Sequence, residues 1–309
     1  MRVVFMGTPD FAVPSLQALY ENGYNVTLVV TQPDKPQGRK QILTPSPVKE
    51  FAVEHGIAVY QPTSMRTQEA YERIKAEAPD YIVVTAFGKI LPKEILALPA
   101  YACINVHGSL LPRYRGAAPI QWSVLNGDTQ TGLTTMLMDE GLDTGDILLQ
   151  EKTAIGENET AGELFDRLAA MSSPILLKTL ALYTKGEITP VRQDDSKADY
   201  VSVLKKEMAA VNWSRPATEI HNLVRGMHPW PVSFTKLNGK ILKIHASRVA
   251  DGCFGNDNGE VSVRDGRMFV RCGENTAIEL LSVQLEGAKR MDVSDFLRGR
   301  AMETKTILG

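Results

Sequence analysis

Four short apolar runs in the first half of the chain constrain its fold more than any other feature. They are rich in β-branched residues and occupy residues 2–6 (RVVFM), 26–31 (VTLVVT), 81–85 (YIVVT) and 103–106 (CINV). A run without polar alternation is typical of a strand buried on both faces. Helical patterns bounded by proline or glycine lie at residues 14–22, 47–55, 66–78 and 161–184. This alternation predicts an α/β fold with a doubly wound, mostly parallel sheet.

The pattern changes after residue 186. Residues 187–202 are polar, contain Pro190 and have no apolar period, so we expect a linker there. One helical pattern then precedes several short strand patterns, at residues 232–237, 241–249, 260–264, 268–272 and 277–283. Asn-Gly and Asp-Gly pairs between them favour hairpin turns, because these residues accept a positive φ. We therefore predict a domain at 1–186, a linker at 187–202 and a small β-barrel domain at 203–309.

Charge also separates the two halves of this 309-residue chain, whose net charge is −2. Residues 1–202 carry 18 Lys and Arg against 24 Asp and Glu, whereas residues 203–309 carry 16 against 12. The basic second half favours a polyanionic partner. An ordinary solvated surface explains the same charge equally well.

Cysteine spacing and hydropathy exclude several classes of protein. The three cysteines form no C-x-x-C pair, which argues against a zinc ribbon and a disulfide framework. No stretch approaches the ~18 apolar residues of a membrane helix, and the apolar run at the N-terminus is too short for a signal peptide. We expect a cytoplasmic protein without a membrane partner.

Polar residues that follow the apolar runs are the candidates for chemistry, because ligands of open α/β sheets bind at the carboxyl ends of strands. Asn105 and His107 are two residues apart, so on a strand their side chains share one face. An amide donor beside an imidazole suits acyl transfer, in which an oxyanion is stabilised and a proton is moved. A hydrogen-bonded turn is the simpler interpretation of the same pair.

Three other segments are also candidates. The loop MDEGLDTGD at residues 138–146 holds Asp143, which is suited to orienting a histidine; a cation site or a plain turn are the alternatives. Residues 7–11 (GTPDF) lack the G-x-G-x-x-G spacing of a dinucleotide site. Residues 32–49 form a long proline-rich basic loop, which suits a phosphate-bearing substrate or is a solvated flap.

These motifs together resemble the methionyl-tRNA formyltransferase family. The resemblance rests on GTPDF (7–11), AFGKILP (86–92), CINVHGSLLPRYRGAAPIQW (103–122) and GLDTGDIL (141–148), and it runs along essentially the whole chain. It implies a Rossmann-like formyltransferase domain followed by an OB-like barrel that holds tRNA. The implied reaction moves a formyl group from 10-formyltetrahydrofolate to the α-amino group of methionyl-initiator tRNA. The transfer is direct, through a tetrahedral intermediate.

The resemblance also assigns roles to residues. It implies that Asn105, His107 and Asp143 are catalytic. The folate-binding segments map onto Ser109, Leu110, Leu111 and Pro112 and onto Lys89, Ile90 and Leu91. Arg39 and Lys40, in a loop slightly shorter than the family's, are the expected tRNA contacts. Neither a metal nor an obligate protein partner is implied.

Rival functions make different demands on the same residues. Another folate-using formyltransferase, acting on a purine precursor or a nucleotide sugar, shares the catalytic residues but leaves the basic barrel unexplained. A non-catalytic RNA-binding protein explains the barrel but leaves Asn105, His107 and Asp143 without a role. A nicotinamide dehydrogenase lacks its glycine fingerprint.

Overall fold

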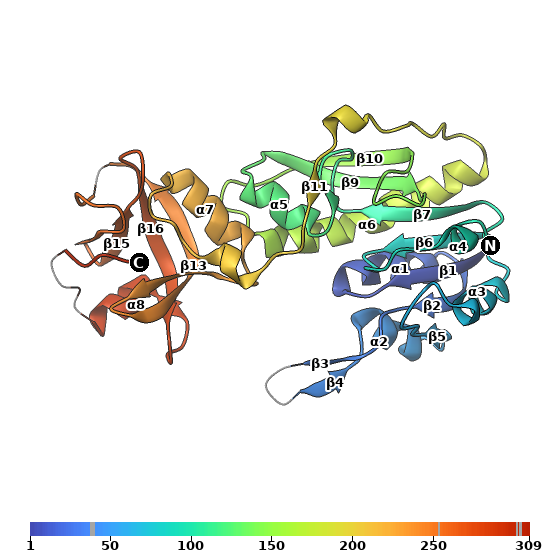
Figure 1. Ribbon diagram of the computed structural model, residues 1–309, viewed down its shortest axis with the longest axis horizontal. Coiled ribbons are helices and arrows are strands. Elements are labelled where there is room, and N and C mark those ends of the chain that lie inside the picture. Colours follow the sequence, from blue (N-terminus) through green and yellow to red (C-terminus); the bar gives the residue numbers. More distant parts are fainter. Residues whose placement is uncertain (38–40, 253, 301, 303–304) are drawn as a thin grey trace. The chain divides into compact units, whose positions relative to one another are not determined.

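The computed structural model describes residues 1–37, 41–252, 254–300, 302 and 305–309. Its chain forms two compact units, whose elements are labelled in Figure 1. The N-terminal unit comprises Met1–Gly116, Thr131–Thr153 and Phe165–Val201, and the C-terminal unit comprises Ala117–Gln130, Ala154–Leu164 and Ser202–Gly309. Most of the predicted linker thus packs within the N-terminal unit, and two segments of the first predicted domain pack within the C-terminal unit. The boundaries at residues 186 and 203 remain predictions, since the compact units do not test where the functional domains begin and end.

A seven-stranded sheet forms the centre of the N-terminal unit, with strand order β10-β9-β7-β6-β1-β2-β5. Its strands are β1 (Arg2–Gly7), β2 (Asn25–Val30), β5 (Val59–Tyr60), β6 (Tyr81–Thr85), β7 (Ala102–His107), β9 (Gln130–Leu137) and β10 (Ile147–Ala154). The strands from β5 to β7 pair in parallel, and β9 pairs antiparallel to β7. Two small pairs accompany the sheet: β3 (Lys35–Gln37) with β4 (Ile42–Thr44), and β8 (Arg115–Gly116) with β11 (Tyr200–Val201).

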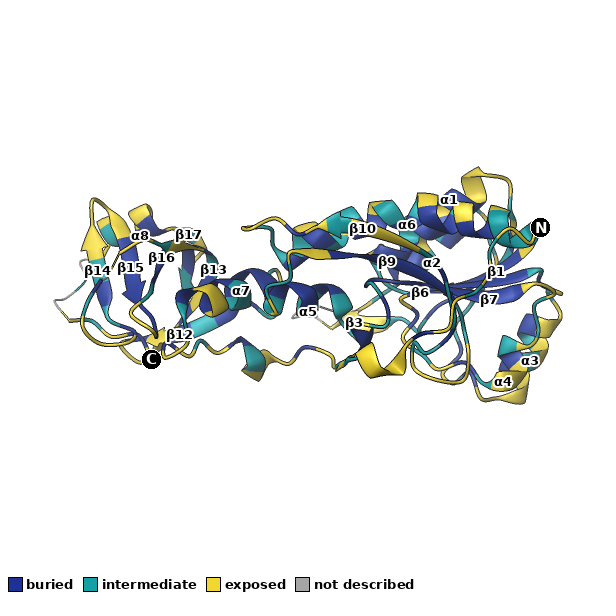
Figure 2. Cartoon of the chain, turned by 90° about the horizontal axis from the view of Figure 1, so that it is seen from above, coloured by how far each residue is buried: buried dark blue, intermediate teal, exposed yellow. Residues whose placement is uncertain are grey.

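Helices cover both faces of this sheet (Figure 2). One face carries α1 (Val13–Glu21), α2 (Pro47–Glu54) and α6 (Ala161–Thr184), and the other carries α3 (Gln68–Lys75) and α4 (Lys93–Leu96). Alternate residues of β1 enter the two cores, Val3 and Phe5 on one side and Val4 and Met6 on the other. This two-sided burial explains the uninterrupted apolar run, since each such side chain contributes about 1.5–3 kcal/mol when it is fully buried.

The C-terminal unit is built on an antiparallel sheet with strand order β12-β13-β16-β15-β14, and β17 also pairs with β16. The strands are β12 (Ser233–Leu237), β13 (Lys240–Ala250), β14 (Val261–Arg264), β15 (Arg267–Arg271), β16 (Ala277–Leu285) and β17 (Met291–Asp292). The helices of this unit are α5 (Pro119–Leu125), α7 (Ala217–Gly226) and α8 (Val293–Arg298). Apolar residues of α7 and α8, such as Ile220 and Phe296, close its core against the sheet.

The predicted fold class is confirmed, because a doubly wound α/β unit is followed by a smaller antiparallel β unit. The sequence patterns missed α5 and the β3–β4 hairpin. Within the described part of the chain, no helix is long and apolar enough to span a membrane.

Candidate active site

Asn105 and His107 lie at the carboxyl end of β7. Asn105 is opposite Val84 of β6 and Met136 of β9, and His107 is opposite Thr134 of β9. Every residue of β7 is buried, because hydrogen-bonded strands flank it on both edges. The two side chains share one face of a rigid strand, as their spacing predicts.

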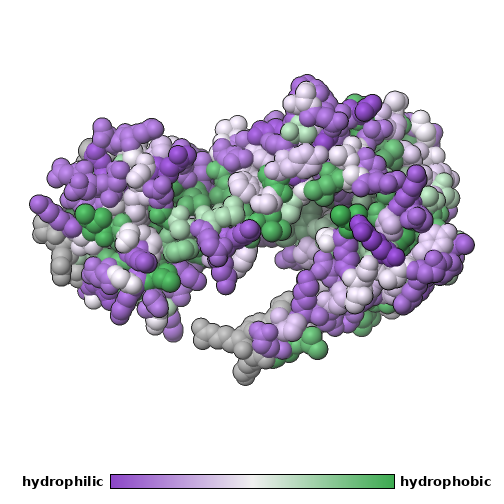
Figure 3. Space-filling view, viewed as in Figure 1, coloured by the Kyte–Doolittle hydropathy of each residue, from purple (hydrophilic) through white to green (hydrophobic). Residues whose placement is uncertain are grey.

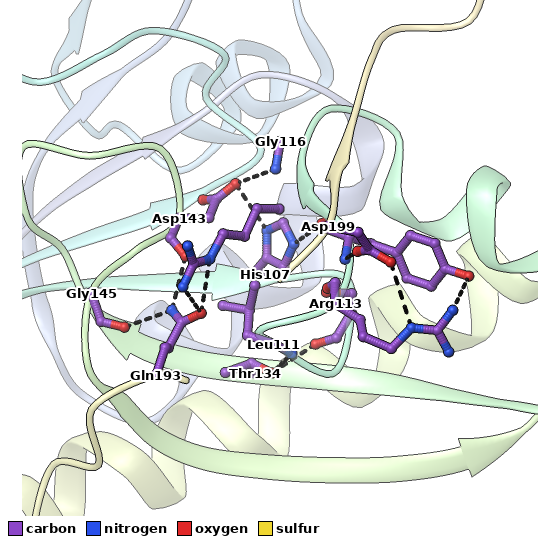
Figure 4. Close-up of polar contacts among 12 residues, drawn as sticks. His107, Leu111, Arg113, Gly116, Thr134, Asp143, Gly145, Gln193 and Asp199 are labelled. Carbon is purple, nitrogen blue, oxygen red and sulfur yellow. Dashed lines mark hydrogen bonds and ion pairs between the residues drawn. The ribbon is translucent and has the colours of Figure 1, made fainter. Parts of the chain in front are cut away.

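The imidazole of His107 lies between two oxygen acceptors (Figure 4). Its Nε2 is 2.9 Å from the Tyr114 carbonyl oxygen, which only accepts, so Nε2 carries a proton. Its Nδ1 is 3.7 Å from Asp143 Oδ2. The Asp143 carboxylate therefore faces the imidazole, and its role in orienting His107 stays a prediction.

Asp143 lies in the loop between β9 and β10, with a backbone φ of +55°. Asp tolerates this left-handed region better than most residues do. Its Oδ2 accepts a hydrogen bond of 2.8 Å from the Gly116 amide. The carboxylate thus joins β8 to the His107 ring.

The loop after β7 is held by residues of β9 and β10. Thr134 Oγ1 donates to the Ser109 carbonyl (2.7 Å) and accepts from the Leu111 amide (3.1 Å). Gln150 Nε2 donates to the Leu111 carbonyl (2.8 Å) and to Thr134 Oγ1 (3.0 Å). Ser109 Oγ donates to the Arg113 carbonyl (2.6 Å). These bonds fix the predicted folate segment Ser109, Leu110, Leu111 and Pro112 beside His107.

The Asn105 side chain has no such partner. The residue is only 8% exposed, yet its amide makes no hydrogen bond with any described residue. Its atoms are not among the fully buried side-chain atoms that lack a hydrogen-bond partner, so the amide remains open to solvent. An unpaired amide next to His107 is a donor that a ligand can use.

A cavity of about 470 Å³ adjoins the Asp143 loop. It is lined by Lys93, Leu96, Ala97, Met138, Asp139, Glu140 and Gly141, which come from α4 and the loop after β9. Its volume is in the range of small-molecule sites, roughly 300–1,000 Å³, and its wall combines apolar and charged groups.

The predicted folate residues of the FGKIL segment differ in their exposure. Lys89 Nζ donates to the carbonyl oxygens of Pro62 and Thr63, each at 2.7 Å. Burial, and then the charge of Lys35, lower its pKa. Leu91 is buried and Ile90 is exposed.

The basic loop between β2 and α2 contains the β3–β4 hairpin. Arg39 and Lys40, the predicted tRNA contacts, lie outside the described residues. The base of the hairpin is held by Lys49, whose Nζ is 2.6 Å from Asp34 Oδ2 and 2.9 Å from Gln61 Oε1. The hydrogen bond from Lys49 is the main reason that the pKa of Asp34 is lowered.

The exposed side chains of the hairpin include apolar ones. Ile42 and Leu43 of β4 are both exposed. Figure 3 shows hydrophobic atoms beside the grey atoms at the end of the hairpin.

Neither a reactive thiol nor a cluster of metal ligands is found at the site among the described residues. Cys103 is buried in β7, and burial raises the pKa of its thiol far above the usual range, as suits a small core residue. Among the described residues, no group of three or more His, Cys, Asp or Glu side chains is arranged to hold a metal ion.

The sequence analysis missed three residues that support the site. Thr134 lies in an apolar strand pattern, and Arg115 is a fully buried arginine within the recognised motif. Gln193 lies in the predicted linker, where no local pattern distinguishes it, yet it is buried and donates to the backbone of the Asp143 loop.

The fold is that of the formyl transferases, as two family models show. A family model described as "Formyl transferase" matches residues 1–180, and one described as "Formyl transferase, C-terminal domain" matches residues 203–301. Curated proteins named methionyl-tRNA formyltransferase are 49% identical over 310 residues in Clostridium novyi and in Caldanaerobacter subterraneus, with all of both chains covered. The chain belongs to the methionyl-tRNA formyltransferase family.

Solved structures share the fold at lower identity. A sugar 3N-formyl transferase crystallised with dTDP and 5-N-formyl-THF matches with a TM-score of 0.69 and 21% identity, covering 94% of this chain and 99% of that one. A methionyl-tRNA formyltransferase from Clostridium thermocellum matches with a TM-score of 0.57 and 19% identity, covering 92% and 98%.

Proposed function

We propose that this chain transfers the formyl group of 10-formyltetrahydrofolate to the α-amino group of methionyl-initiator tRNA, giving N-formylmethionyl-tRNA for translation initiation. The end-to-end similarity to proteins named methionyl-tRNA formyltransferase supports this acceptor. The observation that carries the chemistry is the unpaired, solvent-accessible amide of Asn105 beside the His107–Asp143 pair. The acceptor places the reaction in the cytoplasm.

The donor site is assigned to the surroundings of Asp143. The 470 Å³ cavity suits a flat heterocycle, because apolar side chains of Leu96 and Met138 and polar groups of the 139–141 segment share its wall. The fixed 109–112 segment and the Lys89, Ile90 and Leu91 segment complete the proposed donor-binding residues. Solved structures of the same fold contain 5-N-formyl-THF in one case and tetrahydrofolic acid in another. These ligands support a folate donor.

Asn105 and His107 share the chemical step. The neutral amine of the methionyl ester adds to the formyl carbon, and the carbonyl oxygen gains negative charge. We assign the Asn105 amide as the main donor to that oxygen and His107 as a second donor, whose Nε2–H leaves the Tyr114 carbonyl when substrate binds. The formyl–N10 bond then breaks, and the proton lost by the attacking nitrogen reaches the leaving N10. His107, oriented by Asp143, is the group placed to move that proton.

Two other regions are assigned to the tRNA. Arg39 and Lys40 are the proposed contacts of the basic loop, whose base is anchored by Asp34 and Lys49. In the C-terminal unit, Arg248 and Arg267 are half exposed around the buried Glu279. Two arginines against one carboxylate leave a positive surface, which suits the phosphates of a nucleic acid.

Formyl transfer with labelled donor tests this function. Methionyl-initiator tRNA, uncharged tRNA and glycinamide ribonucleotide are offered separately as acceptors. We expect the label on methionyl-tRNA alone, and loss of most activity in His107→Ala. His55→Ala is the matched control, since this histidine stacks on Phe51 at the end of α2. Labelling of glycinamide ribonucleotide instead would identify a different formyltransferase.

A further inference from the structure

The chain between α6 and the C-terminal unit runs along the candidate active site. Val191 exchanges two backbone hydrogen bonds with Ile147 of β10, at 2.8 and 2.9 Å. Nine residues later, Tyr200 and Val201 form β11 and pair in parallel with β8. Both ends of this segment are therefore tied to strands that flank the Asp143 loop.

Gln193 is the residue of this segment that touches the loop. Its Nε2 donates to the carbonyl oxygens of Asp143 (2.8 Å) and Gly145 (2.7 Å). Its Oε1 accepts from Arg115 Nε (3.0 Å) and Nη2 (2.9 Å). The side chain is 5% exposed, and both N–H groups and both lone pairs are used. Figure 4 shows the contacts of Gln193 with Asp143 and Gly145 as dashed lines.

Arg115 holds that amide in one orientation. Its guanidinium is 2% exposed and also donates to Asp195 Oδ1 (2.8 Å) and to the Tyr200 hydroxyl (3.1 Å). Burial acts to lower the pKa of Arg115, but these hydrogen bonds outweigh it and raise the pKa. Because a guanidinium only donates, it forces the oxygen of Gln193 toward itself and the amide nitrogen toward the loop.

The Asp143 loop needs such an anchor. Asp143 has a positive φ and its neighbour Leu142 is exposed, whereas the hydrogen bonds of Asp139 hold the loop at Gly141 and Thr144. The carboxylate of Asp143 is held by the Gly116 amide and its carbonyl by Gln193. Arg115 and Gly116 are consecutive residues, so one short strand fixes both ends of Asp143.

We infer that Gln193, oriented by Arg115, is a positioning residue that keeps the Asp143 carboxylate directed at His107. This inference rests on the proposed function of Asp143. It makes the predicted linker a part of the catalytic centre, although Gln193 itself contacts no reacting atom. A displacement of about 1 Å in a catalytic group lowers rates up to ~10²-fold, so the anchor has a measurable effect on turnover.

Gln193→Glu tests this directly. The variant has nearly the same shape and keeps the Arg115 contact, but it places a carboxylate oxygen against two carbonyl oxygens. We expect kcat to fall about 10- to 100-fold, with the KM of both substrates changed less than about 2-fold. Gln193→Met, which removes the donors without repulsion, gives the same pattern if the glutamate variant folds poorly. Asp194→Asn is the control, because the contacts of Asp194 are with Ser196 and Lys197 of its own turn.

Hydrogen exchange of the Gly116 amide supplies a readout that needs no substrate. That amide donates to Asp143 Oδ2, so it exchanges at least about 10-fold faster when the carboxylate moves. Unchanged exchange in both Gln193 variants overturns the inference, as does unchanged kcat or a rise confined to the KM of tRNA. If the wild-type chain fails to formylate methionyl-tRNA, the proposed function falls while the exchange measurement still decides whether Gln193 positions Asp143.

Discussion

Replacing Asn105 should lower the rate of formyl transfer while leaving the free energy of unfolding nearly unchanged. The Asn105→Ala variant removes an amide that makes no hydrogen bond with the described residues. Loss of one oxyanion donor typically lowers kcat by ~10²–10³, equivalent to ~2.7–4 kcal/mol of transition-state stabilisation. We expect a loss of this size in kcat, because the mechanism gives Asn105 the main share of that stabilisation.

Folding stability should respond far less. The Asn105 amide makes no hydrogen bond with the described residues and is not fully buried, so its truncation removes only packing contacts. We therefore expect the free energy of unfolding of Asn105→Ala to stay within about 1 kcal/mol of the wild-type value. The isosteric Asn105→Asp should lose still more activity, since it places a negative charge beside the developing oxyanion.

Steady-state formylation and urea unfolding measure the two effects side by side. Asn22→Ala is the matched control, because Asn22 is exposed and its Nδ2 donates to the Ala18 carbonyl (2.9 Å) at the end of α1. Asn22→Ala should lower the free energy of unfolding slightly and leave kcat unchanged. Asn105→Ala should do the opposite. A kcat within about 3-fold of wild type, or a large stability loss, would refute the oxyanion role of Asn105.

Three further predictions concern the catalytic pair, the basic loop and a buried histidine. His107→Ala and Asp143→Asn should each lower kcat by ~10²–10³. The double variant should lose less activity than the product of the two single losses, because the residues act as a unit. Near-normal turnover of either single variant would contradict this. Arg39→Ala should lower kcat/KM for methionyl-tRNA without weakening folate binding. Arg39→Lys should retain only part of the wild-type kcat/KM, because ammonium lacks the planar fork of guanidinium. A defect in folate binding alone would argue against a tRNA contact. Burial lowers the pKa of His221, so the unfolded chain binds a proton first as the pH falls below about 6.5, and stability drops. His221→Gln should flatten the decline of the urea midpoint from about pH 7 to 5, and an unchanged slope would reject this linkage.

Much of the fold could be predicted because long-range packing and local pattern agree there. The apolar run at 81–85 is strand β6, and the amphipathic pattern at 161–184 is helix α6. Both elements bury the residues that made them recognisable. Helix α5 was missed, because it starts after Ala118, a non-glycine residue with a φ of +57° that local sequence does not reveal.

The candidate site could be predicted only in part. Strand periodicity singled out Asn105 and His107 as a pair on one face, and Asp143 was singled out because a turn follows a strand. Their catalytic roles come from the family resemblance and stay predictions. Gln193 could not be found, since its role depends on a contact with Arg115, 78 residues away in the chain. A polar segment with no period resembles a linker until its partners are known.

The central claim, direct transfer to the methionyl amine, is tested most directly by a rapid-quench single turnover. Enzyme mixed with formyl-labelled 10-formyltetrahydrofolate is quenched before and after methionyl-initiator tRNA is added. We expect that the label is never covalently bound to the protein and that it passes from the folate to the α-amino group of methionine. Label attached to the protein before the acceptor is added, or no label on methionyl-tRNA afterwards, would contradict it.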